Sequence, residues 1–503
     1  MRNASSTHQG FRVSSTSNTE QHSHTPLGTQ LRRRKSIQAM ANDAVDNTGL
    51  GTLKRSLGVT QLVMISVGAT LGTGILVILG SAVPVAGPAI WIAFVLAGIT
   101  ALLSAVSYAE MAGMVPVSGS SYSYSYATLG EGMAWVCGWC LVLEYAVSAA
   151  AVAVGAGSYV NQTLEIFGLA LPQALAAGPG EGGIINLSAL IVVILATLLL
   201  VRGARESALA NTVMVIVKIA ILVFFVVVAF TAFNAGNFAP LLPMGAAGVT
   251  GAASMVFFSY IGFDAASTAG EEAKNPQKDL PRAIMIAMVM VTAIYVLVAV
   301  AAIGAREWEW FADSEAALVQ IVSEITGQKW MVLAFALASV IAIVSVVLTT
   351  LYGQTRILLS MGRDGLIPRF FAKISPSTRT PVIGTYVTGA VVAIAASLIP
   401  LGQLAEATSI GTLFAFSLVG VSVIYLRKTQ PDIPRTFRVP LYPVTPMLGI
   451  AACLFLMFNL AGITWLVFGI WMAVGAAIYL AYGRRNSRLG ALDSKAYEAE
   501  LNL

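Results

Sequence analysis

The chain has 503 residues, of which 57% are hydrophobic and 11% are charged, whereas soluble proteins carry about 25% charged residues. This composition excludes a soluble globular protein and indicates a protein that crosses a membrane several times. The net charge of +5 does not indicate nucleic-acid binding, because the basic residues lie in short loops between apolar runs. All three histidines, His8, His22 and His24, precede the first apolar run, and we expect neither a metal site nor a cofactor.

The N-terminal segment 1–57 is polar and has no apolar periodicity. We therefore expect a disordered cytoplasmic tail there. Its basic run, Arg32–Lys35, is most simply a cytoplasmic flank that helps to set topology; a targeting or lipid-binding signal is the alternative. A second cytoplasmic tail is expected over residues 484–503.

Apolar segments long enough to cross a bilayer, which takes about 20 helical residues, recur along the chain. They cover 59–83, 88–113, 131–160, 184–202, 206–233, 247–269, 282–304, 329–353, 380–400, 403–426, 444–460 and 463–483. The predicted fold class is therefore an all-α polytopic membrane protein with twelve transmembrane helices. The third segment is long enough to be tilted or to extend beyond the membrane.

Basic residues in the loops predict the orientation, because Lys and Arg concentrate in cytoplasmic loops. If the N-terminus is cytoplasmic, the outer loops hold only Arg306 and Lys329. The inner loops then hold Arg202, Arg205, Lys274, Lys278, Arg282, Arg356, Arg363, Arg369, Lys373, Arg379, Arg427, Lys428, Arg435 and Arg438. We expect a multi-pass protein of the plasma (inner) membrane with both termini in the cytoplasm.

The first and sixth segments are each interrupted, at Gly72–Gly74 and near Tyr260–Gly262. In a bilayer, a helix break is tolerated only where protein or a polar cavity covers it. Breaks at corresponding positions of two halves point to the substrate site of a secondary transporter. Their offset predicts two five-span repeats of opposite orientation, 58–235 and 246–427, followed by two further spans within 437–483.

The two breaks offer complementary groups to a ligand. Unwinding at Gly72–Gly74 exposes the first backbone N–H groups of the outer half-helix, which suit a carboxylate. The half-helix that ends near Phe257–Tyr260 leaves carbonyl groups that suit an ammonium. A site with donors on one side and acceptors on the other fits a zwitterion, so the sequence predicts an amino acid as substrate.

Ionisable residues at membrane depth are costly, and each is a functional candidate. Lys218 lies in the middle of segment five and either exchanges a proton or acts as a fixed cation; a structural bond to a carbonyl is the alternative. Glu144 either holds a basic substrate side chain or packs as a protonated or hydrogen-bonded residue. For Asp264 we favour a helix-capping or gate-anchoring role over ligand contact, and for Glu110 a structural role.

Several motifs together resemble the amino acid–polyamine–organocation superfamily and, within it, the cationic amino acid transporter family of the bacterial twelve-span type. The resemblance covers about residues 53–488. It is carried by the stretches Gly68–Ile75, Pro116–Ser120, Tyr122–Thr128, Leu143–Tyr145, Phe257–Asp264, Glu271–Lys278, Tyr352–Arg356 and Arg363–Leu366.

The resemblance implies an inverted-repeat, leucine-transporter-like fold with segments one and six unwound, and alternating access. In proton-coupled bacterial members a lysine of segment five takes the place of a sodium ion, and Lys218 matches it. Glu144 matches an acidic residue able to meet a basic substrate, and Thr350 is implied to set the room for the side chain. The rest of the implied substrate pocket is Thr70, Gly72, Thr73, Gly74, Phe258, Ser259 and Ile261.

Two residues depart from the family pattern: Leu76 replaces a common phenylalanine, and Ser259 stands where alanine is usual. The predicted function is secondary transport of L-amino acids, zwitterionic or cationic, coupled to protons; an exchanger or a polyamine carrier is the alternative. No embedded catalytic constellation indicates an enzyme. Membrane lipid is an expected partner, and the sequence leaves open whether a small single-span accessory subunit packs on the bundle.

Overall fold

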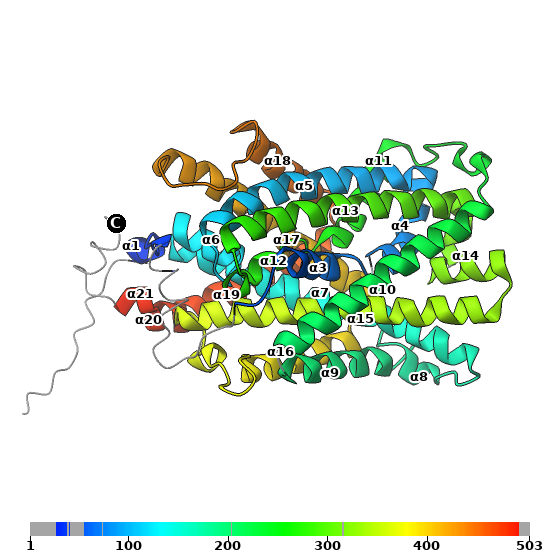
Figure 1. The fold of residues 1–503 in the computed structure, drawn as a ribbon, viewed down its shortest axis with the longest axis horizontal. Coiled ribbons are helices and arrows are strands. Elements are labelled where there is room, and N and C mark those ends of the chain that lie inside the picture. The colour runs from blue at the N-terminus through cyan, green and yellow to red at the C-terminus, as the bar shows by residue number, and fades with distance from the viewer. Residues whose placement is uncertain are drawn as a thin grey trace, which may run out of the picture.

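A computed structural model describes residues 27–37, 40, 55–72, 74–202, 204–313 and 316–491. These residues form a bundle of helices, most of which run along the long axis of the molecule (Figure 1). The described residues contain one isolated β-bridge, between Leu57 and Ala273. The predicted all-α polytopic fold class is confirmed.

The helices of the first half begin with α1 (Leu27–Leu31). They continue with α3 (Val59–Thr70), a π-helical turn (Gly74–Ile78), α4 (Leu79–Ala86), a 3₁₀ turn (Gly87–Ala89), α5 (Ile90–Met114), α6 (Ser121–Thr128), α7 (Glu131–Ile166), α8 (Gln173–Ala176), α9 (Leu187–Arg202), α10 (Ala204–Thr231) and a 3₁₀ turn (Ala235–Phe238). The third predicted span is α7, which has 36 residues and is long, as expected.

The second half begins with α11 (Gly245–Val256), a 3₁₀ turn (Phe257–Tyr260) and α12 (Ala265–Thr268). It continues with a 3₁₀ turn (Gly270–Glu272), α13 (Pro276–Ala305), a 3₁₀ turn (Trp308–Asp313), α14 (Ala317–Thr326), α15 (Lys329–Arg363), a 3₁₀ turn (Arg369–Ala372), α16 (Val382–Leu398), α17 (Leu401–Thr429), α18 (Val444–Phe458), α19 (Gly462–Ile478), a π-helical turn (Tyr479–Gly483), α20 (Arg484–Asn486) and α21 (Arg488–Ala491). The sequence did not predict α14.

Within the described residues, eight helical stretches are long and apolar enough to cross a membrane by length and composition. The first, Val59–Met114, contains the first two predicted spans together. The predicted fourth, ninth and eleventh spans are shorter apolar helices, Leu187–Arg202, Val382–Leu398 and Val444–Phe458. Every predicted span coincides with helix, and the count of twelve stays a prediction.

Helices of the two halves pack on each other in reciprocal pairs. α5 packs on α13, α7 on α15 and α9 on α16, which are the pairs that two five-span repeats would superpose. α3 packs on α13 and α11 packs on α5; likewise, α7 packs on α17 and α15 packs on α10. This reciprocity is what two repeats related by a two-fold axis would produce, and it supports the repeat; the boundaries 58–235 and 246–427 stay predictions.

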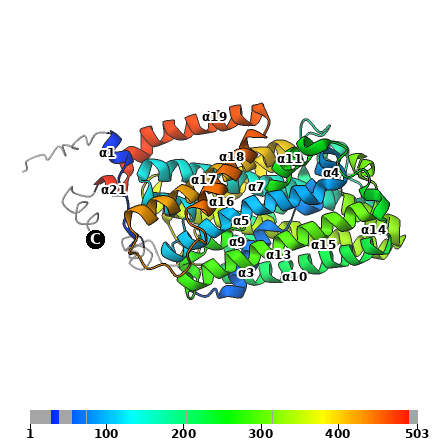
Figure 2. The same ribbon diagram turned by 90° about the horizontal axis from the view of Figure 1, so that it is seen from above.

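The last long helices lie outside this arrangement. α18 packs on α17 and α5, and α19 packs on α17 and α7. In Figure 2, α19 runs along one edge of the bundle. Both helices fall within 437–483, the region assigned to the two extra spans.

The described parts of both terminal segments lie at one end of the bundle, where both views show α1 and α21 (Figures 1 and 2). Lys35 forms a 2.8 Å ion pair with Asp364, and the Asp364 carbonyl accepts from the Arg488 amide. Residues 27–37 therefore pack on the bundle, although we expected disorder throughout 1–57, because their polar groups find buried partners. Residues 1–26, 38–39, 41–54 and 492–503 of the two expected tails lie outside the described residues.

Candidate functional site

The first break lies between α3 and α4. Helix α3 ends at Thr70, and the C-cap residue that follows it, Leu71, is extended (φ −71°, ψ 109°). Helical structure resumes as a π-turn at Gly74. The break predicted from the glycine pair is therefore confirmed. Thr73, one of the predicted site residues, lies outside the described residues.

The second break lies between α11 and α12. The 3₁₀ turn Phe257–Tyr260 is followed by Ile261 in an extended conformation, with φ −64° and ψ 135°. Gly262 then takes a φ of +108°, which side chains other than glycine rarely adopt. The chain leaves helical geometry where the sequence predicted it.

The two breaks touch each other. A Cβ added to Gly74 would lie 2.4 Å from the Cα of Ser259, and one added to Gly262 would lie 2.8 Å from the Cβ of Ala69. The missing side chain of Gly74 thus allows contact with the other broken segment. Ser259 Oγ is buried there and has no hydrogen-bond partner among the residues that the structure describes.

Tyr295 of α13 connects the breaks through its hydroxyl group. Its oxygen lies 2.6 Å from the Thr70 carbonyl and 2.7 Å from the Ser259 carbonyl. Both carbonyls end a half-helix and have lost the helical partner that a continuous helix would supply. Since a hydroxyl carries one hydrogen, Tyr295 donates to one of them at a time.

Lys218 of α10 is fully buried, and its ammonium donates to the Gly68 carbonyl at 2.9 Å. On the same half-helix, Ser66 Oγ donates to the Phe263 carbonyl at 2.6 Å. Thr70 Oγ1 donates to the Ser66 carbonyl at 2.7 Å. The sequence placed Lys218 only in the middle of segment five; the structure brings it to the last turns of α3 before the break.

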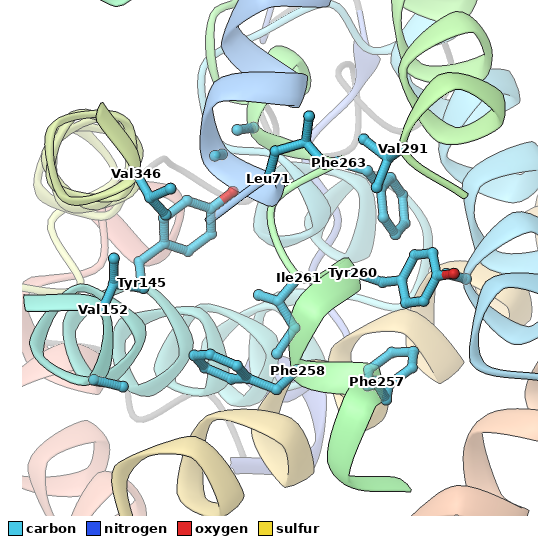
Figure 3. Packing of buried hydrophobic residues seen from close by; sticks show 14 of the residues in the cluster. Leu71, Tyr145, Val152, Phe257, Phe258, Tyr260, Ile261, Phe263, Val291 and Val346 are labelled. Carbon is cyan, nitrogen blue, oxygen red and sulfur yellow. The ribbon is translucent and has the colours of Figure 1, made fainter. Parts of the chain in front are cut away.

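Apolar side chains surround one side of the breaks. Phe258 and Ile261 point toward α7 and α15, from which Tyr145, Val152 and Val346 extend, while Phe257 and Tyr260 point the opposite way (Figure 3). Phe258, Ile261 and Val346 are all buried. The structure therefore provides an apolar surface on the side of segment six that faces α7 and α15.

Gly72 and Thr350 lie against this same region. A Cβ on Gly72 would approach Val346 Cγ2 to 2.4 Å. Thr350, one turn along α15, is buried, and its hydroxyl donates to the Val346 carbonyl at 2.8 Å. Its hydroxyl is thus occupied within its own helix, which leaves its methyl group for packing.

Glu144 and Asp264 form a second, acidic part of the site. Both carboxylate oxygens of Glu144 are buried with no hydrogen-bond partner in the described ranges, and Asp264 and Thr412 lie near them. Asp264 Oδ2 accepts from Tyr145 at 2.9 Å and from Ser120 at 3.3 Å. Its side chain makes no capping bond to α12, so the predicted helix-capping role is wrong. Its bonds to Tyr145 and Ser120 connect the second break to α7 and to the loop before α6.

The sequence interpretation missed Tyr295 and Val346. A single tyrosine in the apolar run 282–304 was the available signal, because a buried hydroxyl needs a partner. Val346 had no signal, since one valine among many does not show which helix face meets a break. Among the described residues there is no group of three His, Cys, Asp or Glu side chains that could hold a metal ion.

Residues 57–479 match the family model described as amino acid permease. The chain belongs to the amino acid permease family. This confirms the superfamily that the motifs resembled, and it establishes at the family level that the chain is a permease and not an enzyme. A multi-pass membrane location follows from the same membership.

Relatives of this amino acid permease are named for different substrates. The branched-chain amino acid permease BcaP of Bacillus subtilis (strain 168) is 43% identical over 461 residues, which cover 91% of this chain and 98% of the relative. A methylthioribose transporter of the same organism is 40% identical over 464 residues, 92% and 99% of the two chains. Cationic amino acid transporter 4, vacuolar, of Arabidopsis thaliana is 36% identical over 414 residues, 80% and 68% of the two chains.

Proposed function

We propose that the protein is a secondary transporter that carries L-amino acids across the plasma membrane by alternating access. The observation that carries this proposal is the meeting of two helix breaks at Gly74 and Ser259, inside a chain of the amino acid permease family. Half-helix ends at one point supply fixed dipoles of both signs, which suit a zwitterion.

The substrate carboxylate faces the amide groups at the start of the outer half-helix, near Gly72–Gly74. The ammonium faces the carbonyl groups that end the half-helix at Tyr260. Ser259 Oγ is buried with no partner in the described part of the chain, and it is a further polar contact. Thr70, Thr73 and Thr350 complete the proposed pocket from segments one and eight.

An apolar substrate side chain fits this pocket best. It would lie against Phe258, Ile261 and Val346, which are buried and extend toward the same region (Figure 3). A branched-chain residue would fill such a surface without leaving a polar group unsatisfied. The Bacillus relative that is named as a branched-chain amino acid permease also favours an apolar substrate side chain.

A cationic substrate is the second candidate, and Glu144 favours it. Its carboxylate oxygens have no partner among the described residues, and a buried carboxylate without a partner is costly unless it is protonated or meets a cation. A lysine or arginine substrate would supply that cation. The plant relatives that are named as cationic amino acid transporters also favour a cationic substrate.

Coupling to protons is proposed through Lys218. As an ammonium it holds the Gly68 carbonyl; as an amine it loses this charged hydrogen bond, so its protonation biases the geometry of segment one. Both termini are proposed to be cytoplasmic, with basic residues concentrated at the same end.

Uptake into proteoliposomes tests the proposal, with labelled leucine, lysine, arginine and methylthioribose, each with and without an inward proton gradient. We expect leucine to accumulate only with the gradient. If lysine or arginine wins and Glu144→Gln abolishes that preference, the cationic candidate replaces the first. Transport that needs an internal counter-substrate and ignores pH would make the protein an exchanger, and uptake of methylthioribose alone would overturn the amino acid proposal.

A further inference from the structure

A cavity of about 510 Å³ lies away from the helix breaks, between the start of α13 and the segment that joins α17 to α18. Its walls include Lys278, Arg282, Met285, Ile286, Thr436 and Phe437. Cationic groups thus occupy one part of the cavity and apolar groups another.

The walls of this cavity are held in place by polar contacts between helices and the segment that joins α17 to α18. Thr436 Oγ1 donates to the Gln277 carbonyl at 2.6 Å, which joins the α17–α18 segment to α13. Glu110 of α5 accepts from Arg427 and from the Val439 amide and pairs with Arg435. Arg427 of α17 and Arg435 of the α17–α18 segment are thus both held by Glu110, and the cavity is built from three parts of the fold that contact one another.

Lys278 and Arg282 are the basic residues in the wall of the cavity. They lie four residues apart in the first turns of α13, so they are neighbours on one helix face. Both are exposed, and neither forms an ion pair or hydrogen bond with any residue in the described ranges. The one acidic residue between them, Asp279, is buried, and its carboxylate accepts from the Asn275 amide. The pair is therefore free to bind an anion, and the N-terminal end of the helix dipole adds to the attraction.

The same face of α13 continues as apolar surface. Ile286, four residues after Arg282, is 50% exposed, and Val289 is 62% exposed. In a membrane-spanning chain, exposed apolar side chains of this kind face lipid chains. A small anion such as phosphate would leave these residues, Met285 and Phe437 without a partner.

We propose that this cavity binds an anionic phospholipid, with the phosphate between Lys278 and Arg282 and an acyl chain along Met285, Ile286 and Phe437. Basic pockets between helices on the cytoplasmic side of a membrane have this chemistry. The site is separate from the transport site and does not depend on the identity of the transported substrate. By binding here, the lipid joins α13 to the segment anchored on α5.

Thermal unfolding of the full-length protein in detergent tests the proposal, with added phosphatidylglycerol, phosphatidylcholine of the same acyl chains, or inorganic phosphate. We expect phosphatidylglycerol to raise the Tm of the wild type more than either of the others does. The double variant K278Q/R282Q should lose at least half of that extra shift. The matched control is R369Q/K428Q, which removes two other exposed basic side chains and should keep it.

Three results would overturn the proposal: an unchanged shift in K278Q/R282Q, an equal loss in the control, or a full shift with inorganic phosphate alone. Native mass spectrometry gives a second measurement that does not depend on unfolding. The number of phosphatidylglycerol molecules retained by the wild type should fall by one in K278Q/R282Q and stay the same in R369Q/K428Q.

Discussion

The ammonium of Lys218 donates a hydrogen bond to the carbonyl oxygen of Gly68, with 2.9 Å between the two atoms. Gly68 lies in the last turn of α3 before the chain unwinds. An ionisable group buried in the bundle therefore acts directly on the backbone that leads into the first break.

Replacing Lys218 by alanine removes the only cation at this position. We expect Lys218→Ala to abolish accumulation driven by a proton gradient, while exchange of labelled for unlabelled substrate without a gradient persists at a reduced rate. Uptake and exchange are measured in the same proteoliposomes. The control is Lys373→Ala, an exposed lysine in a loop, and unchanged pH-dependent uptake in Lys218→Ala would remove the coupling role.

Tyr295→Phe removes the hydroxyl that serves both half-helix ends. We expect the loss of this single donor to cost about 1–3 kcal/mol of stability and substrate affinity to fall at least tenfold, because the breaks lose their common partner. Tyr260→Phe is the matched control, since its buried hydroxyl donates to a single carbonyl, that of Phe94, at 2.8 Å. Thermal unfolding and binding titrations compare the two variants, and equal affinities would show that Tyr295 is structural only.

Gly74→Ala tests the contact between the breaks. The added methyl group would meet the Ser259 backbone at 2.4 Å, so one segment must move, and we expect substrate binding to be lost. In Gly251→Ala, also in a broken segment, the nearest atom would be 3.8 Å away, and binding should be unaffected. Normal affinity in Gly74→Ala would place the substrate site elsewhere.

Glu272→Gln tests the buried ion pair at the end of α15. Glu272 accepts from Arg356 Nε at 2.9 Å and from Tyr352 at 2.6 Å, and the side chains of the pair are 4% and 2% exposed. We expect a loss of about 3–5 kcal/mol, because the arginine keeps a buried charge without a partner. Glu324→Gln, in the exposed pair with Arg306, should cost less than about 1 kcal/mol; chemical unfolding in detergent measures both, and similar losses would contradict this account.

Much of the fold could be predicted because the membrane limits the alternatives. Long apolar runs must become helices, and the glycine clusters at Gly72–Gly74 and near Gly262 mark the places where a helix can end inside the bilayer. Lys218 was found because a charge in an apolar run is rare and therefore noticeable.

Contacts across the bundle could not be predicted in the same way. An apolar span does not show which of its faces meets a break, so the roles of Tyr295 and Val346 required the packed structure. The same limit applies to Gly74, whose missing side chain meets Ser259. Residues 27–37 were expected to be disordered because they are polar, but the carboxylate that pairs with the Lys35 ammonium, Asp364, lies 329 positions away.

The contact between the first and last described helices has a consequence for the connectivity of the chain. The guanidinium of Arg484 donates to Gln30 Oε1 at 2.7 Å, so a short linker could join residue 491 to residue 27 and close the backbone into a ring. A new start in the loop at Gly327, beside α14 at the opposite end of the bundle (Figure 1), would give a circular permutant with the same packed helices. The helices of this permutant would be synthesised and inserted into the membrane in a different order. Comparing its structure with the wild type would show whether the final structure depends on that order.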